Sequence, residues 1–243
     1  MKSFSHIQGF LTTREAANYL NVTEHRVVEL ARNGDLDATR LPERVLLVDA
    51  ASVHRLASIE RFAGRPLNSH VAWGMLWMLD GLQASWLSPV QHCRIKNRLS
   101  EWDAHRVVWS TRKRARRMTF WANDAFVPDI HDELMLTGRS AVAKNTKDEP
   151  DECRCFDLIA QMPSSQLVGY IPESKLKILQ SKCCLLPDAA GNIELHVAEW
   201  LPYFENMLPR SVVAADLAMS LDPRERQAGL DYIEKRLESF RGQ

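Results

Sequence analysis

The alternation of hydrophobic and polar residues is most regular in the first sixty residues. Apolar Ala16, Ala17 and Leu20 follow Thr12, and Glu15 stands three residues after that threonine. A threonine followed at this spacing by glutamate is a capping box, in which each residue bonds the backbone N–H of the other. The pattern therefore predicts a short helix that begins after Thr12.

A second helix is predicted directly after the first. Thr23 is a suitable N-cap, and Val27, Leu30 and Ala31 then recur at spacings of three and four residues. Gly34 can end this helix because glycine accepts the left-handed backbone conformation. Two short helices joined by a tight turn make a helix-turn-helix unit.

A hairpin and a third helix follow the pair. Residues 38–41 and 44–48 are short strand-like runs on either side of Pro42 and Glu43, and Asp49 can cap a helix that ends near Ala57. The order of these elements predicts a winged helix-turn-helix domain over residues 1–60. The start of its second helix would face base edges in the major groove, and the hairpin would lie beside the DNA backbone.

The predicted DNA contacts lie on the exposed side of the second helix and on the hairpin. They are Thr23, His25, Arg26, Arg32, Arg40 and Arg44. Glu24 lies among them and leaves two roles open, a contact to cytosine N4 or a carboxylate in the first turn of the helix.

Residues 61–122 read as a helical, basic linker module. After a break at residues 64–67, one helix is predicted from about Ser69 to Asp80 and another from Ser88, with Pro89 in its first turn. Trp73 and Trp77 are four residues apart, so they share a helix face and are expected in the core.

Residues 123–243 read as an acidic α+β domain. Strands are predicted at residues 155–160, 166–170 and 193–198, and helices after Asp124, after Pro172 and after Asp222. Leu217, Leu221 and Leu230 are expected in its core. The whole chain is thus predicted to be mixed α+β, with three consecutive domains.

Composition narrows the class of protein. The chain has 243 residues, of which 45% are hydrophobic and 26% charged, as in ordinary globular proteins. Its apolar runs are too short to cross a bilayer, and its first residues lack the apolar core of a signal peptide. A cytoplasmic protein without membrane contact is expected.

The net charge of zero conceals an uneven distribution. Residues 1–122 hold 18 Lys+Arg and 11 Asp+Glu, whereas residues 123–243 hold 13 and 20. The densest basic run comprises Arg112, Lys113, Arg114, Arg116 and Arg117. Such a run is often only a solvated face, but beside a helix-turn-helix we interpret it as a surface that contacts DNA phosphates.

Two resemblances agree with a DNA-binding function. The capped helix from Leu11, the turn to Thr23 and the glycine at 34 resemble the excisionase and MerR-like winged-helix family over about fifty residues. That family implies DNA binding through the second helix and the wing.

The second resemblance lies near the C-terminus. Asp216 and Leu217, followed by Asp222, Pro223, Arg224, Arg226 and Ala228, are similar to the C-terminal region of AbiEi-like antitoxin regulators. Those regulators are DNA-binding partners of nucleotidyltransferase toxins. The resemblance implies a toxin partner, with Asp216, Asp222, Arg224 and Arg226 as candidate contacts. The same four residues also fit a helix cap with charge pairs in the first turns.

Catalytic and metal-binding patterns are not found in the sequence. It has no phosphate-binding glycine loop, no nucleophile elbow and no paired-histidine zinc motif. The five cysteines, Cys93, Cys153, Cys155, Cys183 and Cys184, lack the spacing of a zinc site. The chain is expected to be neither an enzyme nor a cofactor-binding protein.

The sequence therefore favours a sequence-specific regulator of double-stranded DNA, an antitoxin that represses its own operon, acting as a homodimer or with a toxin. Two alternatives stay open. One is an antitoxin that directly masks its toxin by protein contact, and the other is an excisionase-like factor that bends DNA during recombination.

Overall fold

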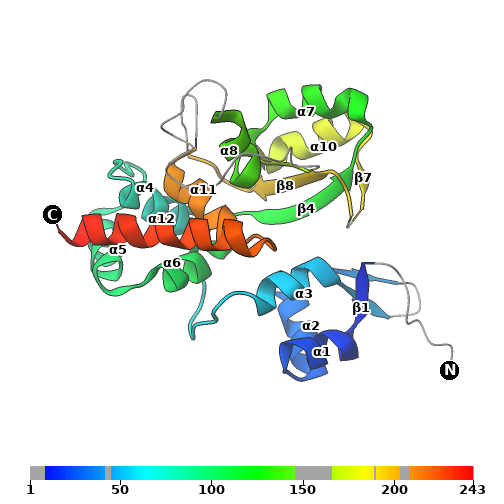
Figure 1. The fold of residues 1–243 in the computed structure, drawn as a ribbon, viewed down its shortest axis with the longest axis horizontal. Helices are drawn as coiled ribbons and strands as arrows, with labels where there is room; N and C mark the ends of the chain where they lie inside the picture. Colours follow the sequence, from blue (N-terminus) through cyan, green and yellow to red (C-terminus); the bar gives the residue numbers. More distant parts are fainter. Residues whose placement is uncertain (1–8, 42–44, 146–165, 189, 203–207, 243) are drawn as a thin grey trace. The chain divides into compact units, whose positions relative to one another are not determined.

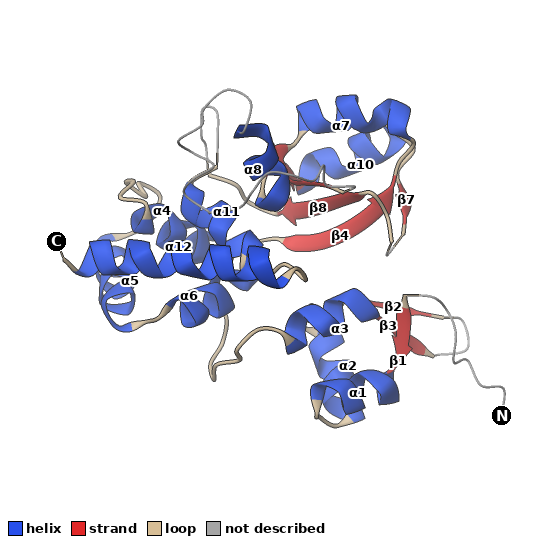
Figure 2. Ribbon diagram, viewed as in Figure 1, coloured by secondary structure: helices blue, strands red, loops and turns tan. Residues whose placement is uncertain are grey.

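Helices and strands follow one another along the chain, and the strands form two separate β-sheets. This confirms the predicted mixed α+β class (Figures 1 and 2). The structure is a computed structural model that describes residues 9–41, 45–145, 166–188, 190–202 and 208–242. The chain divides into two compact units, residues 1–60 and residues 61–243. The strand predicted at residues 155–160, together with Cys153 and Cys155, lies outside the described residues.

The first unit combines three helices with a three-stranded antiparallel sheet. Its elements are β1 (Phe10–Thr12), α1 (Thr13–Leu20), α2 (Glu24–Arg32), β2 (Ala38–Arg40), β3 (Leu46–Asp49) and α3 (Ala50–Ala57). The sheet order is β1-β3-β2. The hairpin strands β2 and β3 match the prediction, whereas β1 was not predicted because three residues are too few to show an alternating pattern.

The helix caps of the first unit confirm the sequence pattern. Thr12 and Glu15 form the predicted capping box, and Thr23 and Asp49 cap α2 and α3 through their side chains. Asn21 stands between α1 and α2 with a φ of 52°, a left-handed conformation that asparagine tolerates. These local signals fix where each helix begins.

The second unit contains eight α-helices and a five-stranded sheet among its described residues. The helices are α4 (Ser69–Leu79), α5 (Pro89–Glu101), α6 (Ala104–Thr111), α7 (Val127–Glu133), α8 (Gly138–Asn145), α10 (Glu173–Lys182), α11 (Arg210–Leu217) and α12 (Pro223–Arg241), with 3-10 turns η1 (Arg112–Arg114) and η2 (Asp124–Phe126). The strands are β4 (Arg116–Trp121), β5 (Met135–Leu136), β6 (Leu167–Pro172), β7 (Leu186–Pro187) and β8 (Ile193–Ala198).

The larger sheet has the order β5-β6-β8-β4-β7. Strands β6 and β8 are parallel, and the other neighbours are antiparallel. Helices α7 and α10 cover one face of the sheet (Figure 2), where Phe120, Ile171 and Leu195 form part of a core with Leu176 and Leu179 of α10.

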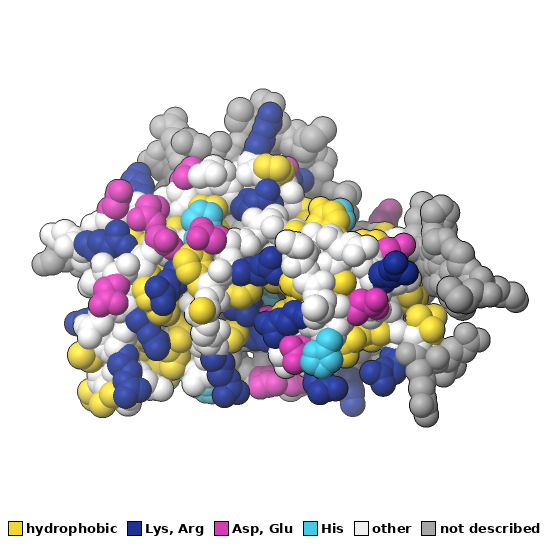
Figure 3. Space-filling view, turned by 90° about the horizontal axis from the view of Figure 1, so that it is seen from below, with side chains coloured by type: hydrophobic (Ala, Val, Ile, Leu, Met, Phe, Trp, Pro, Cys, Tyr) yellow, Lys and Arg dark blue, Asp and Glu magenta, His cyan; other side chains and the backbone are white. Residues whose placement is uncertain are grey.

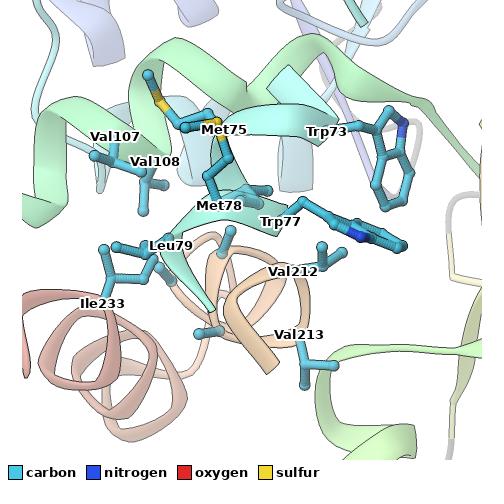
Figure 4. Close-up of a cluster of buried hydrophobic side chains, with 14 of the residues drawn as sticks. Trp73, Met75, Trp77, Met78, Leu79, Val107, Val108, Val212, Val213 and Ile233 are labelled. Atoms are coloured by element: carbon cyan, nitrogen blue, oxygen red, sulfur yellow. The ribbon is translucent and has the colours of Figure 1, made fainter. Parts of the chain in front are cut away.

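A second core lies among the helices. It joins Trp73, Trp77 and Leu79 of α4 to Val212 of α11 and Ile233 of α12 (Figure 4). Both tryptophans are buried, as predicted. Because α4, α5 and α6 share this core with α11 and α12, and β4 pairs with β8, residues 61–122 are not a separate linker module but part of the second unit.

One local expectation, the burial of Leu221, differs from the structure. Leu221 is exposed because it precedes the cap of α12, although Leu217 and Leu230 are buried as expected. Cys184 is exposed, and the neighbouring Cys183 is the thiol that packs in the core. No described helix is long and apolar enough to span a membrane.

Gly229 gives a direct test of how closely α11 and α12 pack. A Cβ atom at this position would lie 2.3 Å from the carbonyl oxygen of Ala214 and 2.5 Å from the backbone nitrogen of Ala218. Because both are backbone atoms, the helices must separate to admit it. We expect Gly229→Ala to lower the free energy of unfolding by about 1–3 kcal/mol, the usual range for overpacking.

Urea denaturation measures this loss, with Gly242→Ala as the control. At Gly242 the added Cβ would lie 3.6 Å from its nearest neighbour, an ordinary contact. We expect the control to change stability by less than about 0.5 kcal/mol. Equal stabilities of the two variants would contradict the close approach.

Candidate nucleic-acid interface

The exposed side of α2 carries four of the predicted DNA contacts. Thr23, His25, Arg26 and Arg32 are all exposed, while Val27 and Leu30 are buried against the rest of the first unit. The Thr23 hydroxyl accepts a hydrogen bond from the backbone N–H of Arg26 at 3.2 Å. The sequence thus places polar side chains and the helix N-terminus on one solvated surface.

Arg26 forms an ion pair on this surface. Its Nη1 donates to Oε2 of Glu29 at 3.0 Å, and Nδ1 of His25 lies 3.8 Å from Oε1 of the same glutamate. The hydrogen bond from Arg26, with the neighbouring positive charges, lowers the pKa of Glu29 despite slight desolvation. An exposed pair of this kind contributes little to stability, so the guanidinium can leave it at small cost.

Glu24 holds a contact within the protein. Its Oε2 accepts a hydrogen bond from the Thr13 hydroxyl at 2.8 Å, which links the starts of α1 and α2. Of the two roles left open by the sequence, this contact favours the carboxylate that braces the helix over the one that reads cytosine.

One of the two predicted hairpin cations, Arg40, lies among the residues that the structure describes. All three residues of β2 are exposed, including Arg40, which pairs in register with Leu46. Arg44 lies outside the described residues, so its predicted contact has no structural account.

The positive charge of the N-terminal half does not reside in the first unit. Residues 1–60 hold 7 Lys+Arg and 8 Asp+Glu, whereas residues 61–122 hold 11 and 3. The basic character therefore belongs to the helices and the β4 segment of the second unit.

The basic run at Arg112–Arg117 is divided between the interior and the surface. Arg114 is only 3% exposed, so it offers no surface to a phosphate. Arg116 is exposed and lies 3.5 Å from a carboxylate oxygen of Glu173, and Arg117 is largely buried. Arg112 and Lys113 are half-buried. The prediction of a phosphate contact is thus wrong for Arg114, which lies in η1 and whose guanidinium bonds to the buried Tyr170 and Asp216.

Arg114 belongs to a buried polar cluster centred on Asp216. Its Nη2 donates to one carboxylate oxygen of Asp216, and its Nε donates to the Tyr170 hydroxyl at 2.7 Å. The other carboxylate oxygen accepts from the hydroxyls of Thr137 at 2.6 Å and Tyr170 at 2.9 Å. We call these residues, with Arg117 and His196, the Asp216 cluster.

Further ionic contacts enclose the cluster. Nδ1 of His196 lies 3.4 Å and Nη2 of Arg117 lies 3.5 Å from Asp216, while Nε2 of His196 lies 2.9 Å from Glu194. Burial opposes ionisation of Asp216, but the charges of Arg114, His196 and Arg117 overcome it and hold its pKa far below the usual value. Burial likewise raises the pKa of Tyr170, which stays a neutral hydrogen-bond donor.

The predicted partner contacts near the C-terminus have mostly structural roles. Asp216 is buried and cannot meet a partner protein. Asp222 caps α12 by accepting from the backbone N–H of Arg224 at 2.8 Å and lies 3.1 Å from Nη2 of Arg139. Arg226 donates to the Ser220 carbonyl at 2.8 Å. Of the four predicted contacts, Arg224 alone is exposed, so this motif mainly secures the turn before α12.

The sequence patterns did not point to the residues that complete these buried contacts, namely Thr137, Arg139, Tyr170, Glu194, His196 and Glu225, whose carboxylate accepts from Arg139. Glu194 and His196 did carry a signal, because they alternate with Ile193, Leu195 and Val197 and so lie on the opposite face of β8. The described residues contain no group of three His, Cys, Asp or Glu side chains that could hold a metal ion.

Among the residues of the Asp216 cluster, we expect substitution of Asp216 to destabilise the fold most. Asp216→Asn leaves Arg114 buried without its counter-charge, and we expect a loss of about 3–5 kcal/mol in the free energy of unfolding at pH 7. The exposed Asp132→Asn is the control and should have almost no effect. A loss for Asp216→Asn no larger than that of the control would contradict the account.

The pH dependence provides a second readout of the same site. Because the folded protein lowers the pKa of Asp216, its stabilisation is complete above the ordinary carboxyl pKa of 3.8 and is lost as the pH falls below it. The free energy of unfolding should therefore fall more steeply between about pH 4 and pH 2 in the wild type than in Asp216→Asn. Parallel curves would mean that folding does not lower the pKa of Asp216.

No family model, curated protein or solved structure matches this chain.

Proposed function

We propose that the chain is a sequence-specific DNA-binding regulator in which residues 1–60 form a winged helix-turn-helix. The observation that carries the proposal is the solvated side of α2, which presents Thr23, His25, Arg26 and Arg32 from a helix packed against α1. A capped helix N-terminus bearing short polar and basic side chains is suited to the major groove.

In this function Arg26 contacts a base edge, and Arg32 and Arg40 contact the phosphate backbone of the DNA. A guanidinium in the first turn of a recognition helix can bind the O6 and N7 atoms of guanine in a bidentate manner. Arg26 would exchange its contact with Glu29 for that base edge. Arg32 of α2 and Arg40 of β2 would contact phosphates, which orient the domain without reading sequence.

The regulated operon is proposed from the resemblance of the C-terminal region to AbiEi-like antitoxin regulators. The protein would repress its own toxin–antitoxin operon, and a homodimer would present two α2 helices to paired half-sites. A toxin partner would meet the second unit near Arg224, the exposed member of the motif.

A specific observation favours a second candidate, a protein-contact antitoxin. The first unit carries one more acidic than basic residue, and α2 itself holds Glu24 and Glu29. A unit without excess positive charge gains little from phosphates, so α2 could instead dock on a basic toxin. An excisionase-like role is distinguished by bending of the bound DNA.

The test uses the purified full-length chain and two fluorescent duplexes, the DNA upstream of its own reading frame and a random duplex of equal length. The proposal expects tighter binding to the upstream DNA, with an affinity that falls as salt rises. No binding to either duplex, together with co-purification of the neighbouring gene product, would establish the protein-contact alternative instead.

Arg26→Ala tests the reading residue. We expect it to weaken binding to the upstream duplex by about 1–3 kcal/mol, the usual value of a bidentate base contact, and to leave binding to random DNA nearly unchanged. Fluorescence anisotropy at fixed salt measures both affinities.

Glu29→Gln is the matched control for Arg26. It removes the carboxylate that engages the Arg26 guanidinium in the free protein, so affinity should stay equal or increase. Equal losses of Arg26→Ala on both duplexes would assign Arg26 to a phosphate, and no loss on either would remove it from the interface.

A further inference from the structure

Two arginines of the second unit converge on one indole ring. The guanidinium carbon of Arg98, on α5, lies 5.3 Å from the centroid of the Trp102 ring, and that of Arg106, on α6, lies 5.0 Å from it. Arg106 also lies 5.9 Å from the ring of Phe62. Guanidinium groups at such distances are attracted by the negative face of an aromatic ring.

The same arrangement continues at the end of α6. The guanidinium carbon of Arg112 lies 3.5 Å from the centroid of the Trp109 ring. The indole N–H of Trp109 donates to the Phe62 carbonyl at 2.9 Å, which fixes the ring beside the Phe62 backbone. Arg98, Arg106 and Arg112 thus form a row with Phe62, Trp102 and Trp109, which we call the arginine–aromatic row.

No carboxylate among the described residues forms an ion pair with Arg98 or Arg106. Asp103 is close in sequence, but its carboxylate caps α6 by accepting from the backbone N–H of Arg106 at 2.8 Å. Arg241, whose Nη2 donates to the Trp102 carbonyl, does have a carboxylate partner, Glu234 at 3.4 Å. Arg98 and Arg106 therefore differ from the neighbouring Arg241 in having no described counter-charge.

This geometry suits an external polyanion. The aromatic rings restrict the long arginine side chains, so that less side-chain entropy is lost when each guanidinium binds a phosphate in a bidentate manner. Two like charges held near one ring repel each other, and an anion placed against both removes that repulsion. In the view of Figure 3, Lys and Arg side chains are interspersed with hydrophobic ones.

We propose that the arginine–aromatic row binds the phosphate backbone of duplex DNA and so supplies the electrostatic affinity that the first unit lacks. The inference rests on the proposed function. Residues 61–122 carry 11 Lys+Arg against 3 Asp+Glu, and Phe62 follows the end of the first unit by two residues. Once α2 engages DNA, this short connection keeps the row at high effective concentration near the same duplex.

The experiment compares two full-length double variants that lose the same charge. Arg98→Gln with Arg106→Gln alters the row and keeps stems that pack on the rings. Lys96→Gln with Lys177→Gln alters two exposed cations outside the row, one on α5 and one on α10. Anisotropy titrations with the upstream and random duplexes at several salt concentrations give the slope of log affinity against log salt.

For the row variant we expect the slope to flatten by about 1.8, or 0.9 for each lost phosphate contact, and the affinity to fall roughly tenfold on both duplexes. The lysine variant should keep nearly the wild-type slope. Equal changes in both variants would overturn the inference, because net charge alone would then explain them. A row variant with wild-type salt slope and affinity would overturn it too. The arginines would then only pack on their aromatic rings.

Failure of the inference is distinguishable from failure of the proposed function. If Arg26→Ala weakens binding while the row variant does not, α2 reads DNA and only the row is misassigned. If wild-type protein binds neither duplex, both proposals fail. Arg98→Lys with Arg106→Lys, which keeps the charges and loses the planar forks, provides a second row variant. It should show a smaller loss of affinity than the glutamine pair, and an equal loss would contradict a charge-based contact.

Discussion

The buried ion pair between Arg114 and Asp216 is the interaction on which the second unit depends. It joins α11 of the helical core to the segment that leads into β4, and hydroxyls of Tyr170 on β6 and Thr137 before α8 complete it. Two charges buried in a protein interior are tolerated only when their remaining bonding capacity is satisfied. The helical segments supply Arg114 and Asp216, whereas β6 and β8 supply Tyr170 and His196, so the cluster is complete only when the helices and the sheet are assembled together.

This constraint changes what the basic segment can do. From the sequence alone, a run of five cations in six residues suggests a surface that binds phosphates. In the fold, however, Arg114 is almost completely buried and Arg117 is largely buried. On α5 and α6, by contrast, the half-buried Arg98 and the exposed Arg106 are accompanied by aromatic rings rather than by carboxylates. Positive charge in this chain thus serves two purposes, a structural one inside the fold and, in our proposal, a DNA-binding one on its surface.

Local structure was predictable wherever a single side chain decides it. Thr12, Thr23, Asp49 and Asp222 cap helices as their positions indicate, because a cap depends only on the next three residues. Long-range partnerships were not predictable. The spacing of Arg114 and Asp216 in sequence, 102 residues, carries no mark that they pair.

The same reasoning explains the domain boundaries and the candidate site. A change in composition near residue 122 suggested a boundary, but β4 pairs with β8 across it, and such pairing depends on chain topology. The exposed side of α2 was predictable because its buried positions recur at helical spacing. The arginine–aromatic row was not, because Phe62, Trp102 and Trp109 meet only once α5 and α6 are packed.

Selection of DNA from a randomised duplex pool by the full-length protein tests the central claim most directly. A sequence-specific regulator should enrich one short sequence over repeated rounds, and its binding to that sequence should weaken steadily as the salt concentration rises. A pool that stays random through repeated rounds, or retention that is independent of salt, would contradict a DNA-binding regulator.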